Sequence, residues 1–417
     1  MKIEIPYGKD KINIEIPKSS NVLLPKSSKT IDEKKLIENA LNKPIDGVSF
    51  NDFISKSKEI LVIVNDATRP TPTAKILEYI RPQLTEHKNI KFIVATGSHR
   101  APTKEEYEFI FGKTYKDFKN NILVNEAREK TDMKYYGKTK RGTPVYFNKI
   151  ISKIKNIIVI GGVEPHYFAG YGGGRKSFLP GIAGYETIEK NHKHSMSEKA
   201  CSLILDKNPV NEDMIDAFNL IRDVNIFSIQ TVLDVNKKLT AITSGSLHKS
   251  FYEATKHVKK TSCIKIKEKA DIVITVAPYP MDINLYQSQK ALDNSKHAVK
   301  ENGIIILVSK CRKGIGDETF LNLLSSAENP QELLEKIGDT YKLGYHKAAK
   351  IAQILLKSQI WAVTDLEDKT VKKAMMKPYK DIQRAIEESI DIIQKRGVKP
   401  KLIIMPKGSL TLPYIEK

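Results

Sequence analysis

Three short polar motifs each follow a run of Ile and Val, and their residue types could bind an anion and move protons. The first occupies residues 65–70, NDATRP, directly after ILVIV. Asp66 could hold a ribose or another polyol, and Arg69 could bind a carboxylate or phosphate through two parallel hydrogen bonds. A simpler interpretation is a strand-to-helix loop in which Asp66 and Arg69 pair with each other. The motif alone does not choose between the two.

The second motif, TGSHR at residues 96–100, follows KFIVA. The pKa of histidine lies close to neutrality, so His99 could accept or donate a proton in a reaction. A single histidine at the end of a strand more often caps a helix or makes a structural hydrogen bond. A role for His99 in chemistry therefore depends on the residues that the fold brings beside it.

The third motif is the long segment EPHYFAGYGGGRKS at residues 164–177, followed by NHKH at 191–194. Three glycines followed by Arg175 and Lys176 are similar to loops whose backbone amides approach an anion. Neither standard nucleotide motif is satisfied, because Arg175 stands where a P-loop and a dinucleotide fingerprint each need a glycine. The segment indicates a large, anionic ligand of another kind, with Lys176 beside it as a charge or an amine nucleophile.

Histidines 99, 166, 192 and 194 could bind a late transition metal, since imidazole is a ligand of nickel, copper, zinc and iron. Their spacing is not that of a zincin or of a Cys/His finger. A cofactor would therefore have to bring most of the metal ligands itself. One of His192 and His194 is expected to be only a helix-surface residue.

A fourth segment, PYPMDINLYQSQKA at residues 278–291, follows ADIVITVA and leads into a predicted helix. Tyr286 and Lys290 lie four residues apart and share one helix face, while Gln287 lies about 100° round the helix. This pattern is typical of an ordinary amphipathic helix start. It could equally form a substrate-carboxylate site, and the cleft between two domains is a frequent place for one.

The elements that position these motifs are short apolar runs that alternate with segments of helical spacing. This alternation predicts an α/β fold with mainly parallel sheets, whose carboxyl strand ends bind ligands. We expect strands at residues 60–66, 91–97, 156–163, 270–279, 303–311, 359–366 and 401–406, and helices at 73–87, 102–112, 210–222, 286–301, 344–357 and 378–396.

A chain of 417 residues is longer than one hydrophobic core usually supports, so two domains are expected. We predict an N-terminal cofactor-binding and catalytic domain at residues 1–267, to which residues from about 399 to 417 return. Residues 268–398 would form a substrate-side domain. The active site is expected in the cleft between the two domains.

Composition limits the classes of partner. The formal charge of +20 comes from lysines spread along the whole chain, without an Arg-rich block, which argues against a nucleic-acid partner. No run of about 18 apolar residues or apolar signal core is present, so no membrane association is expected. Cys201, Cys263 and Cys311 lack CxxC spacing, which fits a reducing cytoplasm.

In their order along nearly the whole chain, DATRP, TGSHR, EPHYFAGYGGGRKS, NHKH and YPMDINLYQSQKA resemble the nickel-pincer lactate racemase family. The resemblance implies two Rossmann-like α/β domains and racemisation or epimerisation of a 2-hydroxy acid. It also implies a nickel-pincer nucleotide, a Ni(II)-pyridinium-3,5-bisthiocarboxylic acid mononucleotide bound covalently to a lysine. Separate biosynthetic proteins would load this cofactor.

The resemblance also implies a role for individual residues. Lys176 would be the attachment point, His192 the nickel ligand, and His99 and His166 the two catalytic bases. The cofactor would be contacted by Asp66, Ala67, Thr68, Arg69, Gly172, Gly173 and Gly174, and the substrate by Arg69, Tyr286, Gln287 and Lys290.

Chemistry fits these roles, because the α-hydrogen beside a carboxylate is a weak acid, whereas its removal as hydride gives a stable 2-keto acid. Two bases would serve two enantiomers. An alternative is a protein that binds a nucleotide or metallo-cofactor without turnover, which would need Lys176 and His192 but not His99, His166 and Lys290 together.

The sequence does not identify the side chain of the substrate. In lactate-specific members we expect a tryptophan in the substrate pocket, but Trp361, the one tryptophan, lies in a predicted strand and is expected in the core. Tyr345 or His346 stands roughly at the pocket position. Lactate, malate, 2-hydroxyglutarate and a sugar acid are therefore all candidates.

Overall fold

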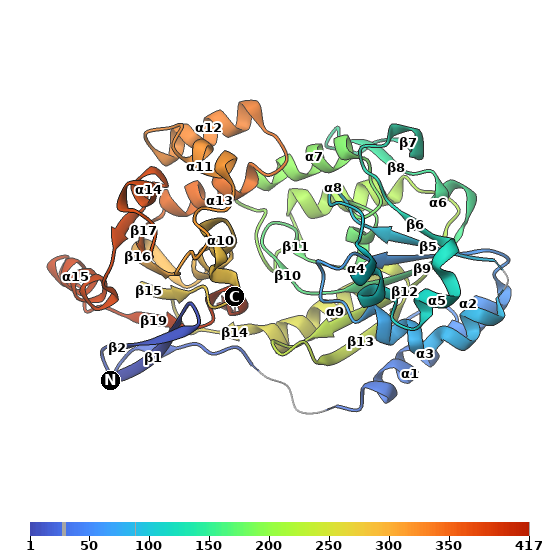
Figure 1. The fold of residues 1–417 in the computed structure, drawn as a ribbon, viewed down its shortest axis with the longest axis horizontal. Coiled ribbons are helices and arrows are strands. Elements are labelled where there is room, and N and C mark those ends of the chain that lie inside the picture. Colours follow the sequence, from blue (N-terminus) through green and yellow to red (C-terminus); the bar gives the residue numbers. More distant parts are fainter. Residues whose placement is uncertain (27–30, 88, 417) are drawn as a thin grey trace. The chain divides into compact units, whose positions relative to one another are not determined.

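The computed structural model describes residues 1–26, 31–87 and 89–416. The chain forms two compact units. Residues 27–261 make up one of them, which we call the inserted unit, and residues 1–26 and 262–417 together make up the other, the terminal unit. Each unit contains its own six-stranded sheet (Figure 1).

This division differs from the predicted one. The N-terminal end of the chain, and not the C-terminal end, joins the other unit. Residues 399–417 do not return to the first domain, because β19 (Leu402–Met405) pairs with β15 (Ala270–Val276) in the terminal unit. Instead the first 26 residues join that unit, where β3 (Asn21–Val22) extends the same sheet beyond β19. Pairing of this kind links segments far apart in sequence, which local pattern does not reveal.

In the inserted unit, every neighbouring pair of strands in the six-stranded sheet is parallel except β13 with β12. In spatial order the strands are β13 (Leu239–Gly245), β12 (Asn225–Leu233), β9 (Asn156–Gly162), β4 (Ile60–Asn65), β5 (Ile90–Ala95) and β6 (Ile122–Val124).

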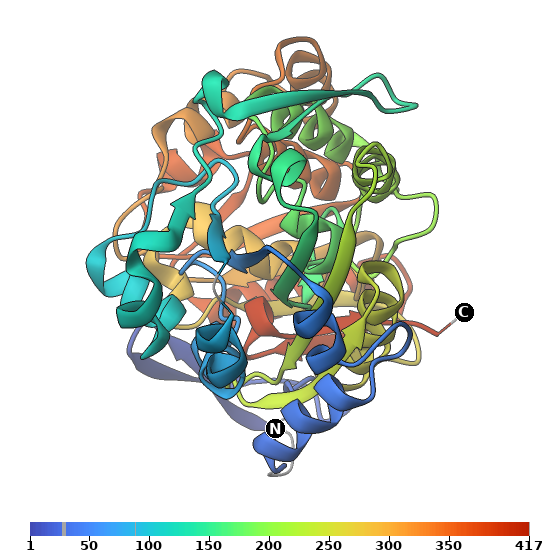
Figure 2. The ribbon, with the colours of Figure 1, turned by 90° about the vertical axis from the view of Figure 1, so that its right-hand side faces the viewer.

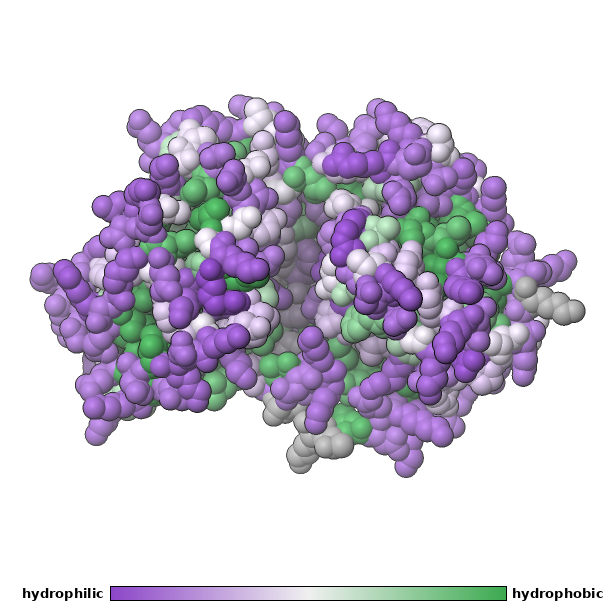
Figure 3. Space-filling model, viewed as in Figure 1, coloured by the Kyte–Doolittle hydropathy of each residue, from purple (hydrophilic) through white to green (hydrophobic). Residues whose placement is uncertain are grey.

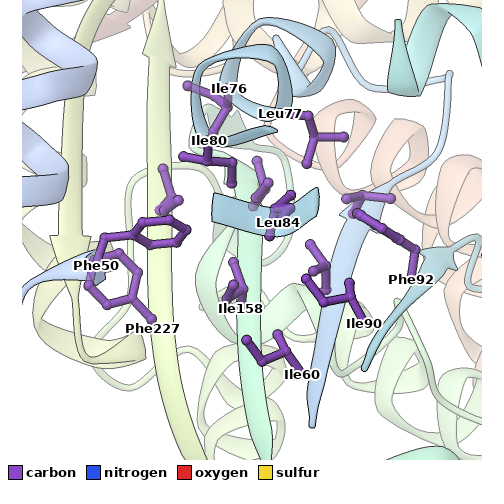
Figure 4. Close-up of a cluster of buried hydrophobic side chains, with 14 of the residues drawn as sticks. Phe50, Ile60, Ile76, Leu77, Ile80, Leu84, Ile90, Phe92, Ile158 and Phe227 are labelled. Atoms are coloured by element: carbon purple, nitrogen blue, oxygen red, sulfur yellow. The ribbon is translucent and has the colours of Figure 1, made fainter. Parts of the chain in front are cut away.

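One face of this sheet is buried by helices that carry apolar residues at helical spacing. Ile60, Val62 and Val64 alternate along β4 toward this face, as the two-residue period of a strand requires. Ile76, Ile80 and Leu84 of α3 (Thr73–Glu86) pack against them in the same cluster (Figure 4). The packing fixes the height at which β4 and β5 end, and therefore where the first two motifs begin.

The remaining helices of the inserted unit are α1 (Glu33–Asn42), α2 (Phe50–Lys56), α4 (Lys104–Phe111), α5 (Thr114–Phe118), α6 (Ile150–Lys153), α7 (Tyr185–Lys193), α8 (Pro209–Asn219) and α9 (Leu247–Ser262). Thr103 and Glu106 form a capping box at the start of α4, which ends the second motif's loop. The hairpin of β7 (Met133–Lys138) and β8 (Pro144–Asn148) lies at the edge of the unit (Figure 2).

In the terminal unit, all neighbouring strands of the main sheet are parallel. The order is β18 (Lys377–Tyr379), β17 (Ser358–Val363), β16 (Val299–Val308), β15, β19 and β3. Smaller pairs are β1 (Lys2–Tyr7) with β2 (Asp10–Glu15), and β14 (Cys263–Lys265) with β20 (Leu412–Tyr414). The helices are α10 (Leu285–Ser295), α11 (Glu318–Leu324), α12 (Pro330–Thr340), α13 (His346–Leu355), α14 (Asp368–Lys373) and α15 (Ile382–Lys395).

The predicted α/β class and all seven predicted strands are confirmed, and so is the core position of Trp361, which is 1% exposed. The predicted helix at 286–301 is too long, because α10 ends at Ser295 and β16 begins at Val299. Hydrophilic residues cover much of the face drawn in Figure 3, with apolar residues in scattered patches. Within the described residues, no helix combines the length and apolar character needed to span a bilayer.

Candidate active site

The first two motifs meet at the carboxyl ends of β4 and β5. These strands are parallel neighbours, with Asn65 opposite Ala95, so the loops that follow them start side by side. His99 Nδ1 lies 2.7 Å from Asp66 Oδ2, and Thr68 Oγ1 donates a hydrogen bond of 2.7 Å to Asp66 Oδ1. Asp66 pairs with His99, and not with Arg69 as the simpler interpretation of the first motif proposed.

The Asp66–His99 pair combines a buried carboxylate with an accessible imidazole. The side chain of Asp66 is 7% exposed and that of His99 is 47% exposed. Burial alone would raise the pKa of Asp66, but the hydrogen bonds from His99 and Thr68 lower it overall. A charged Asp66 accepts a hydrogen bond from the N–H at Nδ1 of His99, which leaves the lone pair of Nε2 directed away from the carboxylate.

His166 and Lys176 meet in the third motif, inside the inserted unit. His166 belongs to β10 (Pro165–His166), which pairs with β11 (Gly170–Tyr171), and Lys176 lies on a 3-10 turn at Gly174–Ser177. Their Nε2 and Nζ atoms are 3.3 Å apart. Burial, followed by the charges of Arg69 and Arg175, holds the pKa of Lys176 well below its usual value. An uncharged amine is the form of lysine that acts as a nucleophile.

The environment of His166 also favours its neutral form. Burial is the largest cause of its lowered pKa, and the charge of Lys176 is the next. The backbone N–H of Ala169 donates to Nδ1 of His166 at 3.3 Å. Because a backbone amide can only donate, this nitrogen carries the lone pair, and the proton of the neutral ring is on Nε2, facing Lys176.

His192 and His194 have different surroundings, although only Lys193 lies between them. The ring of Phe168 packs edge-on against both His166 and His192, with centroid distances of 4.5 and 5.0 Å. His194 lies instead against Thr143, at 3.4 Å, and Asp213, at 3.8 Å. His192 is therefore the one near His166 and Lys176, and His194 belongs to a separate polar cluster.

Arg69 connects the first motif to the third. Its Nη1 lies 3.8 Å from Glu164 Oε1, and both side chains are 39% exposed. Glu164 immediately precedes β10, so this contact joins the loop after β4 to the loop after β9. No role was predicted for Glu164 from the sequence, although it stands at a strand end with the other motif residues.

The glycine run is explained by close packing within the protein. A Cβ atom on Gly174, whose φ is +54°, would come within 2.7 Å of the Phe251 ring, and one on Gly173 within 2.7 Å of Val163. The amide of Gly172 already donates to Glu164 O, and that of Gly174 to Gln230 Oε1. These two amides are therefore engaged within the protein, and contact between Gly172–Gly174 and a cofactor stays a prediction.

Arg175 supports this loop from within. The sequence suggested an anion-binding side chain, but Arg175 is 1% exposed and donates to the carbonyls of Ala169 and Tyr171 at 2.8 and 3.2 Å. Its guanidinium also lies 4.4 Å from the ring centroid of Phe251. Gln230 on β12, also missed, holds the loop from the sheet side, because its Nε2 donates to Ser228 while its Oε1 accepts from Gly174.

The three remaining predicted residues lie in the terminal unit. Tyr286, Gln287 and Lys290 are in the first turns of α10, whose cap Asn284 accepts the amide of Gln287. Gln287 and Lys290 are exposed, and Tyr286 packs edge-on against Phe320 with a centroid distance of 5.4 Å. The prediction of a site between the two units stays a prediction.

The inserted unit thus gathers Asp66, Arg69, His99, His166, Lys176 and His192 from loops at the carboxyl ends of its strands and from α7. Ala67 is partly buried and Thr68 exposed beside Asp66. Among the residues that the structure describes, no three His, Cys, Asp or Glu side chains form a metal-binding group. The arrangement offers one imidazole that can take a proton, one neutral amine, and cations for an anionic ligand.

The chain is similar in sequence to proteins named lactate racemase. The family model for the lactate racemase N-terminal domain matches residues 7–202, and that for the C-terminal domain matches residues 265–411. The chain is 30% identical to a lactate racemase of Thermoanaerobacterium thermosaccharolyticum, over 97% of each protein. It is 29% identical to a lactate racemase of Lactiplantibacillus plantarum, over 97% of this chain and 98% of the relative.

The fold agrees with these matches. The lactate racemase apoprotein from Thermoanaerobacterium thermosaccharolyticum superimposes with a TM-score of 0.87 at 30% identity, covering 100% of both chains. Similarity in sequence and in fold therefore extends over nearly the whole chain. On this basis the chain belongs to the lactate racemase family.

Proposed function

We propose that this chain is an isomerase that racemises or epimerises a 2-hydroxy acid, lactate or a larger one, in the cytoplasm. The observation that carries the proposal is the grouping, within one unit, of the Asp66–His99 pair with His166 and Lys176. The relatives named lactate racemase support the reaction class. The scattered cysteines support the compartment.

We propose a nickel-pincer nucleotide as the cofactor. The residues fit this cofactor: Lys176 is a partly buried amine whose pKa is lowered by burial, and the imidazole of His192 packs against Phe168, the same ring that Lys176 lies over. Without a protein-made metal cluster among the described residues, most metal ligands would come from the cofactor. Asp66, Ala67, Thr68, Arg69 and Gly172 to Gly174 would contact it. Separate biosynthetic proteins would load it.

When bound, this cofactor supplies a reversible hydride acceptor. The chain's own residues would do the rest. His99, oriented by Asp66, would take the hydroxyl proton at Nε2, and His166 would serve the opposite face. Arg69 would hold the substrate carboxylate, together with Tyr286, Gln287 and Lys290 of the terminal unit. Burial of the His166 ring limits the access of water to that base.

A protein that binds the cofactor without turnover is the alternative. It would need Lys176 and His192, but it would not need a histidine held by a buried carboxylate. The 2.7 Å contact between His99 and Asp66 therefore favours an enzyme. The two alternatives separate in an assay, because only the enzyme interconverts enantiomers.

The test is intact mass and nickel analysis of protein from cells that make the pincer cofactor, comparing wild type, Lys176→Ala and the exposed control Lys91→Ala. We expect a mass adduct and about one nickel per chain in wild type and in the control, and neither in Lys176→Ala. Loaded protein should then racemise 2-hydroxy acids in D2O without solvent deuterium at C2. Wild type without adduct or nickel, or loaded protein without racemase activity, would reject the proposal.

A further inference from the structure

Two lysines lie where α13 packs against the start of α10 in the terminal unit. Lys347, in the first turn of α13, places its Nζ 3.9 Å from the ring centroid of Tyr286 and donates to the Tyr286 carbonyl at 3.0 Å. Lys290 follows Tyr286 by one helical turn on α10 and is exposed. The helix that carries the proposed substrate-side residues is therefore bordered by a second ammonium group.

The charges of these two lysines are not balanced by the protein. Among the described residues, no carboxylate forms an ion pair with Lys290 or Lys347, whereas Lys296, at the C-terminal cap of α10, pairs with Asp293 at 2.6 Å. Burial and then the charge of Lys290 lower the pKa of Lys347 to about 8, while Asp293 acts in the opposite direction. No charged group of α11 or α12, which also contact α13, contributes.

An ammonium group that is partly buried without a carboxylate partner is unfavourable in the free protein, and a bound anion would relieve it. In the proposed function, Arg69 and Lys290 already provide two cations for the one carboxylate of lactate. The methyl group of lactate would gain nothing from a second ammonium group. The excess charge therefore matches a substrate that carries two anionic groups.

We propose that Lys347 binds a second carboxylate of the substrate, so that the chain acts on a 2-hydroxy dicarboxylate of four or five carbons. This inference rests on the proposed function, in which Lys290 binds the carboxylate next to the reacting carbon. Arg69 and Lys290 would hold the carboxylate common to all 2-hydroxy acids. Lys347 would distinguish the dicarboxylate from lactate.

The rival explanation is that Lys347 only supports Tyr286 through its ring and carbonyl contacts. Two substitutions separate the explanations. Lys347→Met removes the charge and the hydrogen bond, whereas Lys347→Gln removes the charge but keeps a donor for the Tyr286 carbonyl. If Lys347 only supports Tyr286, Lys347→Gln should keep the wild-type preference between substrates. If Lys347 binds a carboxylate through its charge, Lys347→Gln should lose that preference.

The experiment compares kcat/KM for malate and for lactate in cofactor-loaded wild type, both Lys347 variants and the exposed control Lys342→Met. We expect wild type to prefer malate, and the malate-to-lactate ratio to fall at least tenfold in both Lys347 variants but not in the control. Thermal unfolding of each variant checks that it is folded.

The pH profile gives a second readout. In wild type, kcat/KM for malate should fall relative to lactate as the pH rises through about 8, because Lys347 then loses its proton. This decrease should be absent in Lys347→Met. A wild type that racemises lactate in preference to malate, or variants that lose both activities equally, would overturn the inference while leaving the proposed function. Nickel-loaded protein that racemises neither acid would overturn both.

Discussion

His99 and His166, the two proposed bases, are held by opposite kinds of partner. His99 is half exposed and donates a hydrogen bond from its Nδ1–H to a buried carboxylate, whereas His166 is buried and accepts a backbone N–H at Nδ1. The free nitrogen of His99 therefore carries a lone pair, and that of His166 carries a proton directed at Lys176. In this conformation only His99 is ready to take a proton.

The difference teaches that the residue type alone does not fix the chemical state of a histidine; the group bonded to its other nitrogen does. A pair of enantiomers imposes one further condition. Because their equilibrium constant is 1, kcat/KM must be equal in both directions for any variant. Unequal surroundings of the two histidines can therefore appear only in kcat and KM taken separately.

Removing either histidine is expected to have the largest effect. His99→Ala and His166→Ala should each lower kcat/KM by about 10²–10⁴-fold, the usual contribution of a general acid or base, and equally for both enantiomers. Initial rates with each enantiomer measure this. The partly exposed His257→Ala serves as control and should keep full activity. Full activity in His166→Ala would mean that His99 is the one base, and that the two histidines do not act as a pair.

Adding one methyl group to the glycine loop beside His166 should show that this loop tolerates less change than an open turn elsewhere in the inserted unit. Gly174→Ala should destabilise the protein by about 2–4 kcal/mol, combining the strain of a positive φ with overpacking against Phe251. Gly142→Ala is the matched control, with a φ of +81° and no atom within 4 Å of its Cβ. Denaturant unfolding measures both. Equal losses would mean that the contact with Phe251 is not limiting.

Removing the charge of Asp66 should lower the ability of His99 to act as a base, while His166 should be unaffected. Asp66→Asn removes the charge and offers an amide that can donate to Nδ1, which favours the wrong tautomer of His99. We expect kcat/KM to fall about tenfold to hundredfold, in line with the loss of one hydrogen bond to a charged group. Asp117→Asn, which breaks the exposed pair with Arg81, should not change it. An unchanged rate in Asp66→Asn would show that His99 needs no carboxylate.

The smallest effect is spectroscopic. In the protein without cofactor, ¹⁵N NMR of the imidazole nitrogens should find the proton of His99 on Nδ1 and that of neutral His166 on Nε2. In Asp66→Asn the pattern of His99 should change while that of His166 stays. The same tautomer at both positions would show that the two surroundings are equivalent in solution.

Much of this arrangement follows from local sequence. Strands buried on both faces must be apolar throughout, so β4, β5 and β9 stand out, and the polar residues after them fall at one sheet edge. Asp66 and His99 meet for that reason. β12 was missed because Ser228, Gln230 and Thr231 interrupt its apolar run. Gln230, oriented by Ser228, holds the glycine loop, a contact made only in three dimensions.

The direction in which a side chain points could not be predicted from the sequence either. Arg175 and Lys176 are adjacent in sequence, yet Arg175 turns into the protein and Lys176 toward His166. The glycine motif placed both beside a predicted anionic ligand, with Lys176 as a charge or an amine nucleophile, and it did not separate their directions. The separation of His192 from His194 likewise depends on what Phe168 and Asp213 contact, and the spacing of the two histidines carries no information about that.

The insertion of one unit within the other sets an order of events during synthesis. β3 leaves the ribosome early, but its partner β19 is made near the end of translation, with the whole of residues 27–261 in between. At about 5–20 residues per second, that delay is on the order of tens of seconds. The inserted unit can therefore complete its fold before β19, the strand that pairs with β3 of the first 26 residues, has been synthesised. Nascent chains stalled before residue 402 should contain a protease-resistant inserted unit and an accessible N-terminal segment.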